Sequence, residues 1–344
     1  MEPHVTVKTV LKRGALVAAA NWQVTAIQFV AESTFKMLLT IPVVGGLLLV
    51  ALVLGHALPE LIGGELRTSL GYIASALRSE PLALMAFLAS FAIVGLAGSV
   101  FMFLVKGGTV AVLAAGERDG GTVEQPPLHL RAFWTAAAFS LDRFQKGCRY
   151  LLRRYLRLGL LLVAVYGVST GAYLGGLFVA YRSVGDSSLE WTMWAGIASA
   201  ALVAWITLVN FLYLLIQMVI AVDDCSVRSA ARRVVRFLRS ESRLVFGVFL
   251  VVLVLVMGAT VVSVIATTSL GLIAFVPLAG LTVIPLQLLA WLFRGLVFQY
   301  LGLSALAAYL NLYRRTLAPA GEALSGGNCL PGRSEATRQT VTAG

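Results

Sequence analysis

Arginine side chains positioned to bind anions are the clearest chemistry in this sequence. Between residues 226 and 243 an arginine recurs every three or four positions. On a helix that turns about 100° per residue, these side chains fall within about 80° of arc, opposite Val234, Phe237 and Leu238. Guanidinium groups bind phosphate through paired hydrogen bonds, so this face is predicted to bind anionic lipid head groups. The candidates are Arg228, Arg232, Arg236, Arg239 and Arg243.

A second basic face lies at residues 137–157. Its basic side chains fall within about 140° of arc and face away from Leu151 and Tyr155. Both segments are predicted to be amphipathic helices on the cytoplasmic membrane surface, with their apolar faces in the acyl boundary. The alternative is that the arginines only set topology, which needs no common face. The candidates here are Arg143, Arg149, Arg153, Arg154 and Arg157.

Acidic and hydroxyl side chains stand where the helix over 226–243 would begin. Asp223, Asp224 and Ser226 are residue types that stabilise a helix N-terminus, through hydrogen bonds to free backbone amides and through the helix dipole. We therefore expect these residues to cap this helix.

Charged residues also occur at membrane depth. Glu32 and Lys36 are four positions apart, in the order that favours an ion pair on a helix. We expect this pair to snorkel where a slanted N-terminal helix, about 17–35, meets the first span. Arg294 lies 20 residues before Arg314, about 30 Å along a helix, so we expect it to snorkel toward the outer interface.

Three uncharged polar residues fall within apolar segments, and we expect them to form one shared hydrogen-bond set between spans. They are Asn210, Gln217 and Gln287. Polar groups inside a bilayer can also mark a transport path. Such a path would follow the first and last spans, because prolines and glycines interrupt both of them, at 42–46 and at 271–285.

The sequence contains no recognisable motif for catalysis or metal binding. It has no phosphate-binding loop, no HExxH and no paired CxxC, and its three histidines are scattered. The three cysteines show no paired spacing, which argues against a disulfide framework. We therefore predict no enzyme, no cofactor and no metal site. The enzyme alternative, a lipid-modifying activity, would use glutamates of the first outside loop, Glu60, Glu65 and Glu80.

The elements that position these residues are those of a membrane protein. Of 344 residues, 59% are hydrophobic and 12% charged, whereas a soluble domain is about 45–50% apolar and about 25% charged. Uncharged runs bracketed by charges are long enough for six helices, since a span needs about 20 residues. The predicted fold is all-α, a polytopic integral membrane helical bundle over residues 1–316. The predicted spans are about 37–59, 81–105, 158–181, 191–222, 244–268 and 286–313.

Basic residues set the predicted orientation. With the N-terminus inside, 22 of the 27 lysines and arginines fall in cytoplasmic segments. We therefore predict a multi-pass protein of the bacterial cytoplasmic (inner) membrane, with both termini in the cytoplasm and no cleaved signal peptide. The net charge of +11 indicates anionic lipid as the partner, and no soluble domain remains to bind nucleic acid.

Glycines and prolines mark further features of the chain. Those near 269–284 predict non-helical or re-entrant backbone, with an interfacial segment or part of a seventh span as alternatives. Gly167, Gly171 and Gly175 are predicted to allow close helix packing, within the chain rather than between chains. Residues 317–344, rich in small and polar types, are predicted to be disordered.

Two stretches resemble a known family. QMVIAVDDCSVRSAARRVVRFLRSESRLVF (217–246) and KGGTVAVLAAGE (106–117) are similar to segments of uncharacterised bacterial membrane proteins related to the membrane domain of glycerophosphoryl diester phosphodiesterases. In that family an acidic residue closes the fourth span and a basic helix follows, which Asp223, Asp224 and Arg232 match. The resemblance implies a bacterial inner-membrane module. It implies no hydrolysis, because the catalytic barrel is missing.

Together these features predict a non-enzymatic integral membrane protein. It would organise or sense anionic lipid, or scaffold a membrane complex with another membrane protein, through its basic cytoplasmic helices. The alternative is a transporter or permease-like subunit, with its path near the interrupted segments of spans one and six.

Overall fold

Helices make up all the regular structure that can be described. This computed structural model describes residues 6–54, 81–121, 123, 130–184, 188–274 and 279–324. Within these ranges every regular element is an α-helix, which confirms the predicted fold class. The helices are α1 (Val7–Ala20), α2 (Trp22–Leu54), α5 (Pro81–Asp119), α6 (Leu130–Ala136), α7 (Leu141–Val184), α8 (Ser188–Asp223), α9 (Val227–Ser240), α10 (Ser242–Ala274) and α11 (Ala279–Leu324).

Six of the described helices, α2, α5, α7, α8, α10 and α11, are long and apolar enough to cross a membrane, as predicted. The first span begins at Trp22, earlier than the predicted residue 37. Glu32 and Lys36 do not interrupt it, because they pair along the helix with Oε1 and Nζ 2.6 Å apart.

The helix predicted over 17–35 is instead divided at Asn21, between α1 and α2. The buried Asn21 amide donates to the carbonyls of Val17 (2.9 Å) and Ala136 (2.8 Å), and its oxygen accepts from the Ala138 amide (2.9 Å). Asn21 therefore connects the α1–α2 turn to the segment between α6 and α7.

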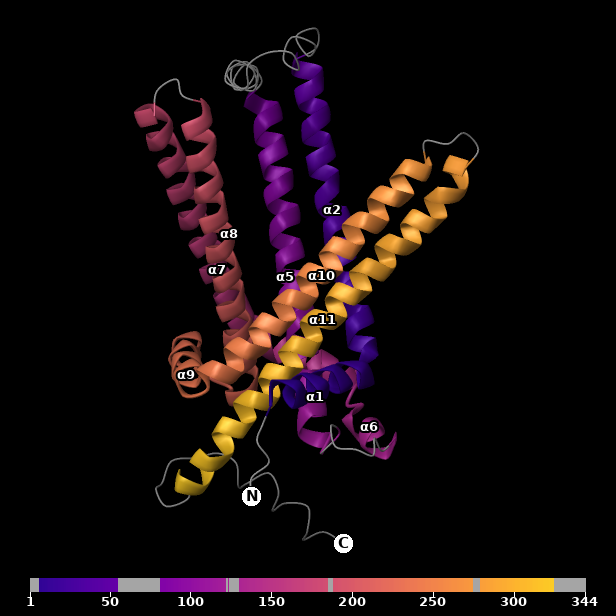
Figure 1. Cartoon of the computed structure of the whole chain (residues 1–344), viewed down its shortest axis with the longest axis vertical. Helices are drawn as coiled ribbons and strands as arrows, with labels where there is room; N and C mark the ends of the chain where they lie inside the picture. Colours follow the sequence, from indigo (N-terminus) through magenta and orange to yellow (C-terminus); the bar gives the residue numbers. More distant parts are fainter. Residues whose placement is uncertain are drawn as a thin grey trace.

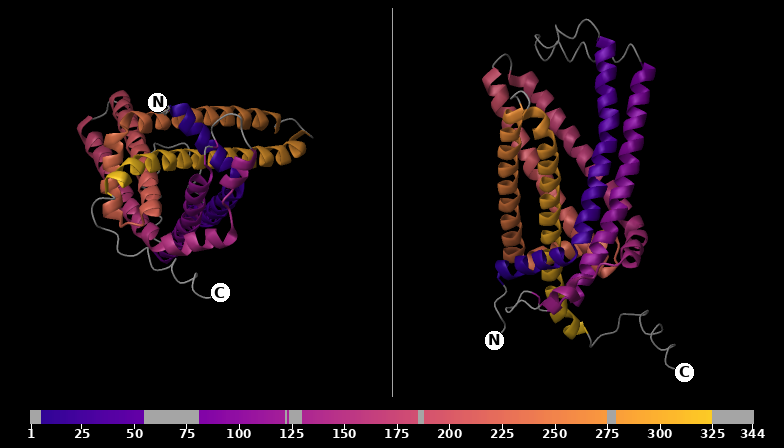
Figure 2. Two further views of the ribbon diagram at one scale, coloured as in Figure 1. Left: turned by 90° about the horizontal axis from the view of Figure 1, so that it is seen from below. Right: turned by 90° about the vertical axis from the view of Figure 1, so that its right-hand side faces the viewer.

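The long helices form three hairpins, α2/α5, α7/α8 and α10/α11. Figure 1 shows that they pack together at one end and diverge toward the other, and Figure 2 shows the same arrangement from two further sides. The end where α1, α6 and α9 lie is called the base. The start of α1 and the end of α11 both lie there (Figure 1).

The buried core lies at the base. Away from the base the apolar side chains are exposed, and the buried share of each span's apolar stretch ranges from 6% to 39%. This exposure fits a lipid environment, where acyl chains solvate apolar side chains as well as protein does. Fully buried core residues include Val17, Leu113, Tyr155, Leu215 and Leu310, which lie on α1, α5, α7, α8 and α11.

Small residues allow close helix contact at the base. A Cβ added at Gly14 of α1 would lie 2.4 Å from the Ser304 carbonyl oxygen of α11. One added at Gly147 of α7 would lie 2.5 Å from the Ala111 Cβ of α5. These contacts join α1 to α11 and α5 to α7, the two most extensive helix–helix contacts in the described part of the chain.

The predicted close packing of Gly167, Gly171 and Gly175 is wrong within this chain. A Cβ added at each would meet nothing within 4 Å among the described residues. These glycines lie in the second half of α7, which ends at Val184.

The prediction of a separate surface helix over 137–157 is also wrong. Helix α7 continues without a break from Leu141 to Val184, because no proline interrupts its backbone hydrogen bonding. Its 44 residues extend about 66 Å at 1.5 Å per residue, about twice the hydrocarbon thickness. The basic segment is thus the basal part of a long helix.

Most of the predicted break near 269–284 is helical as well. α10 extends to Ala274 and α11 begins at Ala279, and residues 275–278 lie outside the described ranges. The tail predicted to be disordered from 317 is helical to Leu324, and residues 325–344 lie outside the described part.

Candidate functional site

The arginine face of α9 is fixed to the base by its opposite side. Ala230, Val234 and Phe237 are buried, and the Phe237 ring meets that of Tyr313 on α11 edge-on, with centroids 5.3 Å apart. The apolar side therefore packs against protein, so its predicted insertion in the acyl boundary is wrong. The arginines at 228, 232, 236 and 239 all remain exposed on the other side.

Asp223, at the end of α8, does not cap α9. Its carboxylate accepts hydrogen bonds from Arg233 Nη1 on α9 (2.6 Å) and from the Tyr313 hydroxyl on α11. The bond to Asp223 raises the pKa of the Arg233 guanidinium. Ser226 occupies the N-cap position of α9 without a side-chain cap hydrogen bond. The expected capping is therefore replaced by links between helices.

Asp224 forms a second link, to α7. Its backbone is in the left-handed region, with φ 50°. The carboxylate accepts hydrogen bonds from the Tyr150 hydroxyl and from Arg154 Nη1. The turn between α8 and α9 is thereby tied to the basal part of α7.

Two of the ten predicted lipid-binding arginines are engaged within the protein. Arg154 pairs with Asp224, and Arg143 donates to the Ala138 carbonyl oxygen at 2.8 Å and lies 3.9 Å from Asp119. The other eight are exposed and have no ion pair with any residue that the structure describes. They are Arg149, Arg153, Arg157, Arg228, Arg232, Arg236, Arg239 and Arg243.

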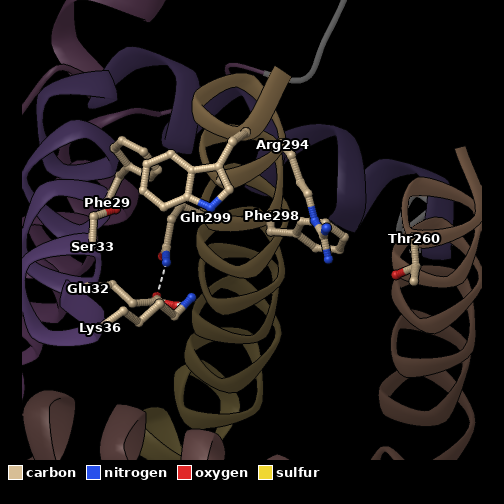
Figure 3. Close-up of a pocket in the computed structure, with 10 residues that line it drawn as sticks. Phe29, Glu32, Ser33, Lys36, Thr260, Arg294, Phe298 and Gln299 are labelled. Carbon is tan, nitrogen blue, oxygen red and sulfur yellow. Dashed lines mark hydrogen bonds and ion pairs between the residues drawn. The ribbon is translucent and has the colours of Figure 1, made fainter. Parts of the chain in front are cut away.

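A cavity of about 470 Å³ lies between α2, α10 and α11, away from the arginine faces (Figure 3). Glu32 is central to it, because it pairs with Lys36 and also accepts a hydrogen bond from the Gln299 amide of α11. Phe29 and Trp291, with ring centroids 6.2 Å apart, form an aromatic wall. The pair predicted within α2 is therefore part of a site that spans two hairpins.

Arg294 lines the same cavity. Figure 3 shows its side chain beside Phe298, on the side of α11 toward Thr260 of α10, while Glu32 and Lys36 lie on the other side. Its guanidinium carbon is 5.7 Å from the Phe298 ring centroid. No carboxylate among the described residues pairs with it. The sequence placed Arg294 near an interface and gave no sign that it shares a cavity with Glu32.

The three uncharged polar candidates are not brought together. The Asn210 side-chain oxygen accepts from the Tyr166 hydroxyl at 2.6 Å, between α8 and α7. Gln217 is buried at the base, where its backbone carbonyl accepts from the Tyr155 hydroxyl at 3.0 Å. Gln287 is half-buried on α11. A single hydrogen-bond set of these three residues is therefore wrong, and the cavity reaches neither Asn210 nor Gln287.

Sequence reasoning missed a buried polar network at the base. Arg13 of α1 donates from Nε to Glu117 Oε1 of α5 at 2.8 Å, and Asn311 of α11 donates to the same oxygen at 2.6 Å. Arg13 also donates to the backbone carbonyls of Glu117 (3.1 Å) and Gly121. All three side chains are buried. The network connects the three helices that meet at the centre of the base.

A signal for this network was present in the sequence. Arg13 lies on the apolar stripe of α1 that also contains Val10 and Val17, where an arginine needs a buried partner. Asn311 likewise interrupts the apolar run that ends α11. Neither position identifies Glu117 as the partner.

No family model, curated protein or solved structure matches the chain. The resemblance to the phosphodiesterase-related membrane domains therefore stays a prediction. Among the described residues, no group of three histidine, cysteine, aspartate or glutamate side chains could hold a metal. Cys148 and Cys225 are free thiols. The glutamates of the enzyme alternative, at positions 60, 65 and 80, lie outside the described ranges.

Proposed function

We propose that this chain is a non-enzymatic membrane protein that organises or senses anionic lipid, or holds a membrane complex together, through its basal arginine faces. The observation that supports the proposal is the set of eight exposed arginines, without ion pairs in the described part of the chain, on α9, the start of α10 and the basal end of α7. The proposed location is the bacterial inner membrane with the base in the cytoplasm, as the bias of basic residues favours.

The way α9 is held strengthens this proposal. Its buried side and the Arg233–Asp223 pair fix the helix against α8 and α11, so its free arginines need no folding event before they meet a membrane. Each basic residue near an anionic leaflet contributes about 1 kcal/mol. Three arginines lost together would therefore weaken lipid association by about 3 kcal/mol, on the order of a hundredfold.

The test is the triple substitution of Arg232, Arg236 and Arg239 by glutamine. Phosphatidylglycerol that stays with the purified chain in mild detergent is measured against phosphatidylcholine, at low salt. A matched control removes the same charge from exposed residues elsewhere at the base, as Lys8→Gln, Arg118→Gln and Arg131→Gln. Selective loss in the first variant supports the proposal. Equal retention in wild type and both variants removes it.

A second candidate function is a transporter or permease-like subunit. It is favoured by the cavity, because most of its polar lining comes from α2 and α11, the first and last spans. Ser33→Cys, in a chain without its native cysteines, would report access to the cavity. Labelling of this residue by a membrane-impermeant thiol reagent from both sides of sealed vesicles supports transport, and labelling from neither side contradicts it.

A further inference from the structure

The cavity between α2, α10 and α11 is surrounded by more positive than negative charge. Lys36 and Arg294 line it together with one carboxylate, Glu32. Among the described residues that line the cavity, two basic side chains thus share one acid, which leaves a formal excess of one positive charge. An excess of charge within a membrane requires a counterion, because the bilayer solvates charge poorly.

Arg294 is the basic residue of the cavity that most needs a counterion. It lies 15 residues from the start of α11, about 22 Å along the helix, and therefore well inside the span. A guanidinium group has five N–H donors. Its contact with the Phe298 ring satisfies none of them by a conventional hydrogen bond, and no protein acceptor is found for them in the described part of the chain. An anionic ligand with several oxygens would provide the acceptors.

The cavity also has the form of a site for an amphiphile. Its volume of about 470 Å³ lies within the range of about 300–1,000 Å³ typical of small-molecule sites. Polar atoms of Ser33, Thr260 and Gln299 line it beside the aromatic wall. The neighbouring surface of α11 exposes large apolar side chains, with Leu289 61% and Phe293 68% exposed. A polar head can therefore lie inside while acyl chains lie along this surface.

We infer that the cavity binds the head group of one anionic phospholipid, with its phosphate on Arg294, on the side of α11 toward Thr260. The Thr260 hydroxyl donates to the Val256 carbonyl oxygen at 2.8 Å, so it can accept a hydrogen bond from a glycerol hydroxyl of the head group. This site is separate from the basal arginine faces, and it stands whether or not those faces bind lipid.

Salt separates the two kinds of binding in an experiment. Association with exposed arginines at the base is screened at 1 M salt, where the Debye length is about 3 Å, whereas a head group held beside Arg294 inside the membrane span is screened much less. The full-length chain is equilibrated with phosphatidylglycerol and phosphatidylcholine, washed at about 1 M salt, and its bound lipid counted by native mass spectrometry. Wild type should retain one phosphatidylglycerol per chain.

Two substitutions test the cavity itself. Arg294→Gln should reduce retention at least about tenfold, because it removes a charge-assisted hydrogen bond, and Arg294→Lys should restore part of it. Gly295→Val keeps every charge but fills the cavity, since even a Cβ at Gly295 would lie 2.2 Å from the Phe29 ring. It should therefore also lose the lipid. The surface triple variant described above should keep it.

Several outcomes would overturn the inference. They are a wild type that retains no phosphatidylglycerol at high salt, and an Arg294→Gln or Gly295→Val chain that retains as much as wild type. Displacement of the lipid by millimolar inorganic phosphate would show that the site takes free phosphate, and would also overturn the lipid assignment. If the surface triple variant loses only the lipid that about 1 M salt also removes, the result supports the function proposed for the base and leaves the cavity site in place.

Discussion

Glu117→Ala tests whether the buried network at the base holds α1, α5 and α11 together. The substitution removes the acceptor of two charge-assisted hydrogen bonds, from Arg13 at 2.8 Å and from Asn311 at 2.6 Å. Such bonds contribute about 1.5–3 kcal/mol each. Arg13 would keep its bonds to two backbone carbonyls, but its buried charge would lose its counterion, a change that costs about 3–5 kcal/mol. We expect about 3–5 kcal/mol of destabilisation, because these two estimates describe the same loss.

The lower end of that range is the better expectation. Glu117 Oε2 has no hydrogen-bond partner among the described atoms, so the wild-type carboxylate is itself incompletely satisfied. The free energy of unfolding would be measured by denaturant titration in mixed micelles. Asp142→Ala is the matched control, because Asp142 forms an exposed pair with Lys146 at 2.7 Å, and such pairs contribute about 0.3–0.5 kcal/mol.

A double variant separates a buried charge from a general packing defect. Arg13→Met combined with Glu117→Leu removes both charges and keeps apolar volume, so it should be more stable than Glu117→Ala. If Glu117→Ala destabilises the chain no more than Asp142→Ala does, the network does not hold the base together, and the reasoning from burial and pairing is refuted.

Three further predictions concern the helix contacts and the orientation. Gly14→Val should destabilise the chain by about 1–3 kcal/mol in the same titration, because its Cβ would overlap α11, whereas Gly167→Val, which faces open space, should change stability little. Asn21→Ala removes three hydrogen bonds and should cost about 2–4 kcal/mol in that titration. Arg236→Cys, in a chain without native cysteines, should react with an impermeant thiol reagent only from the cytoplasmic side, and periplasmic labelling would reverse the proposed orientation.

The helical architecture could be predicted because it depends on local patterns. Charged residues bracket apolar runs, and each run of about 20 residues implies a span whatever its neighbours are. The arginine spacing of 228–243 likewise predicts a helix with one basic face, and α9 extends from Val227 to Ser240. The predicted end of the basic helix at residue 157 was wrong, because the charges of 143–157 suggest a membrane surface. In the structure, helical hydrogen bonding continues from that segment into the span.

The sites were less predictable because they depend on contacts distant in sequence. Glu32 and Arg294 share a cavity although 261 residues separate them, and nothing local to either position indicates the other. The acids at 223 and 224 looked like helix caps, since capping is the local use of an acid before a helix. Their actual partners lie on α7, α9 and α11, and the packing of the base alone brings them near.

The divergence of the hairpins has a mechanical consequence. Each hairpin packs against the others mainly at the base, so a change in bilayer thickness can alter its tilt without disturbing the core. The lining of the cavity comes from two different hairpins, with Lys36 on one and Arg294 on the other. Thinning or thickening of the membrane would therefore change the shape of the cavity, and its affinity for an anion would follow the thickness of the surrounding bilayer.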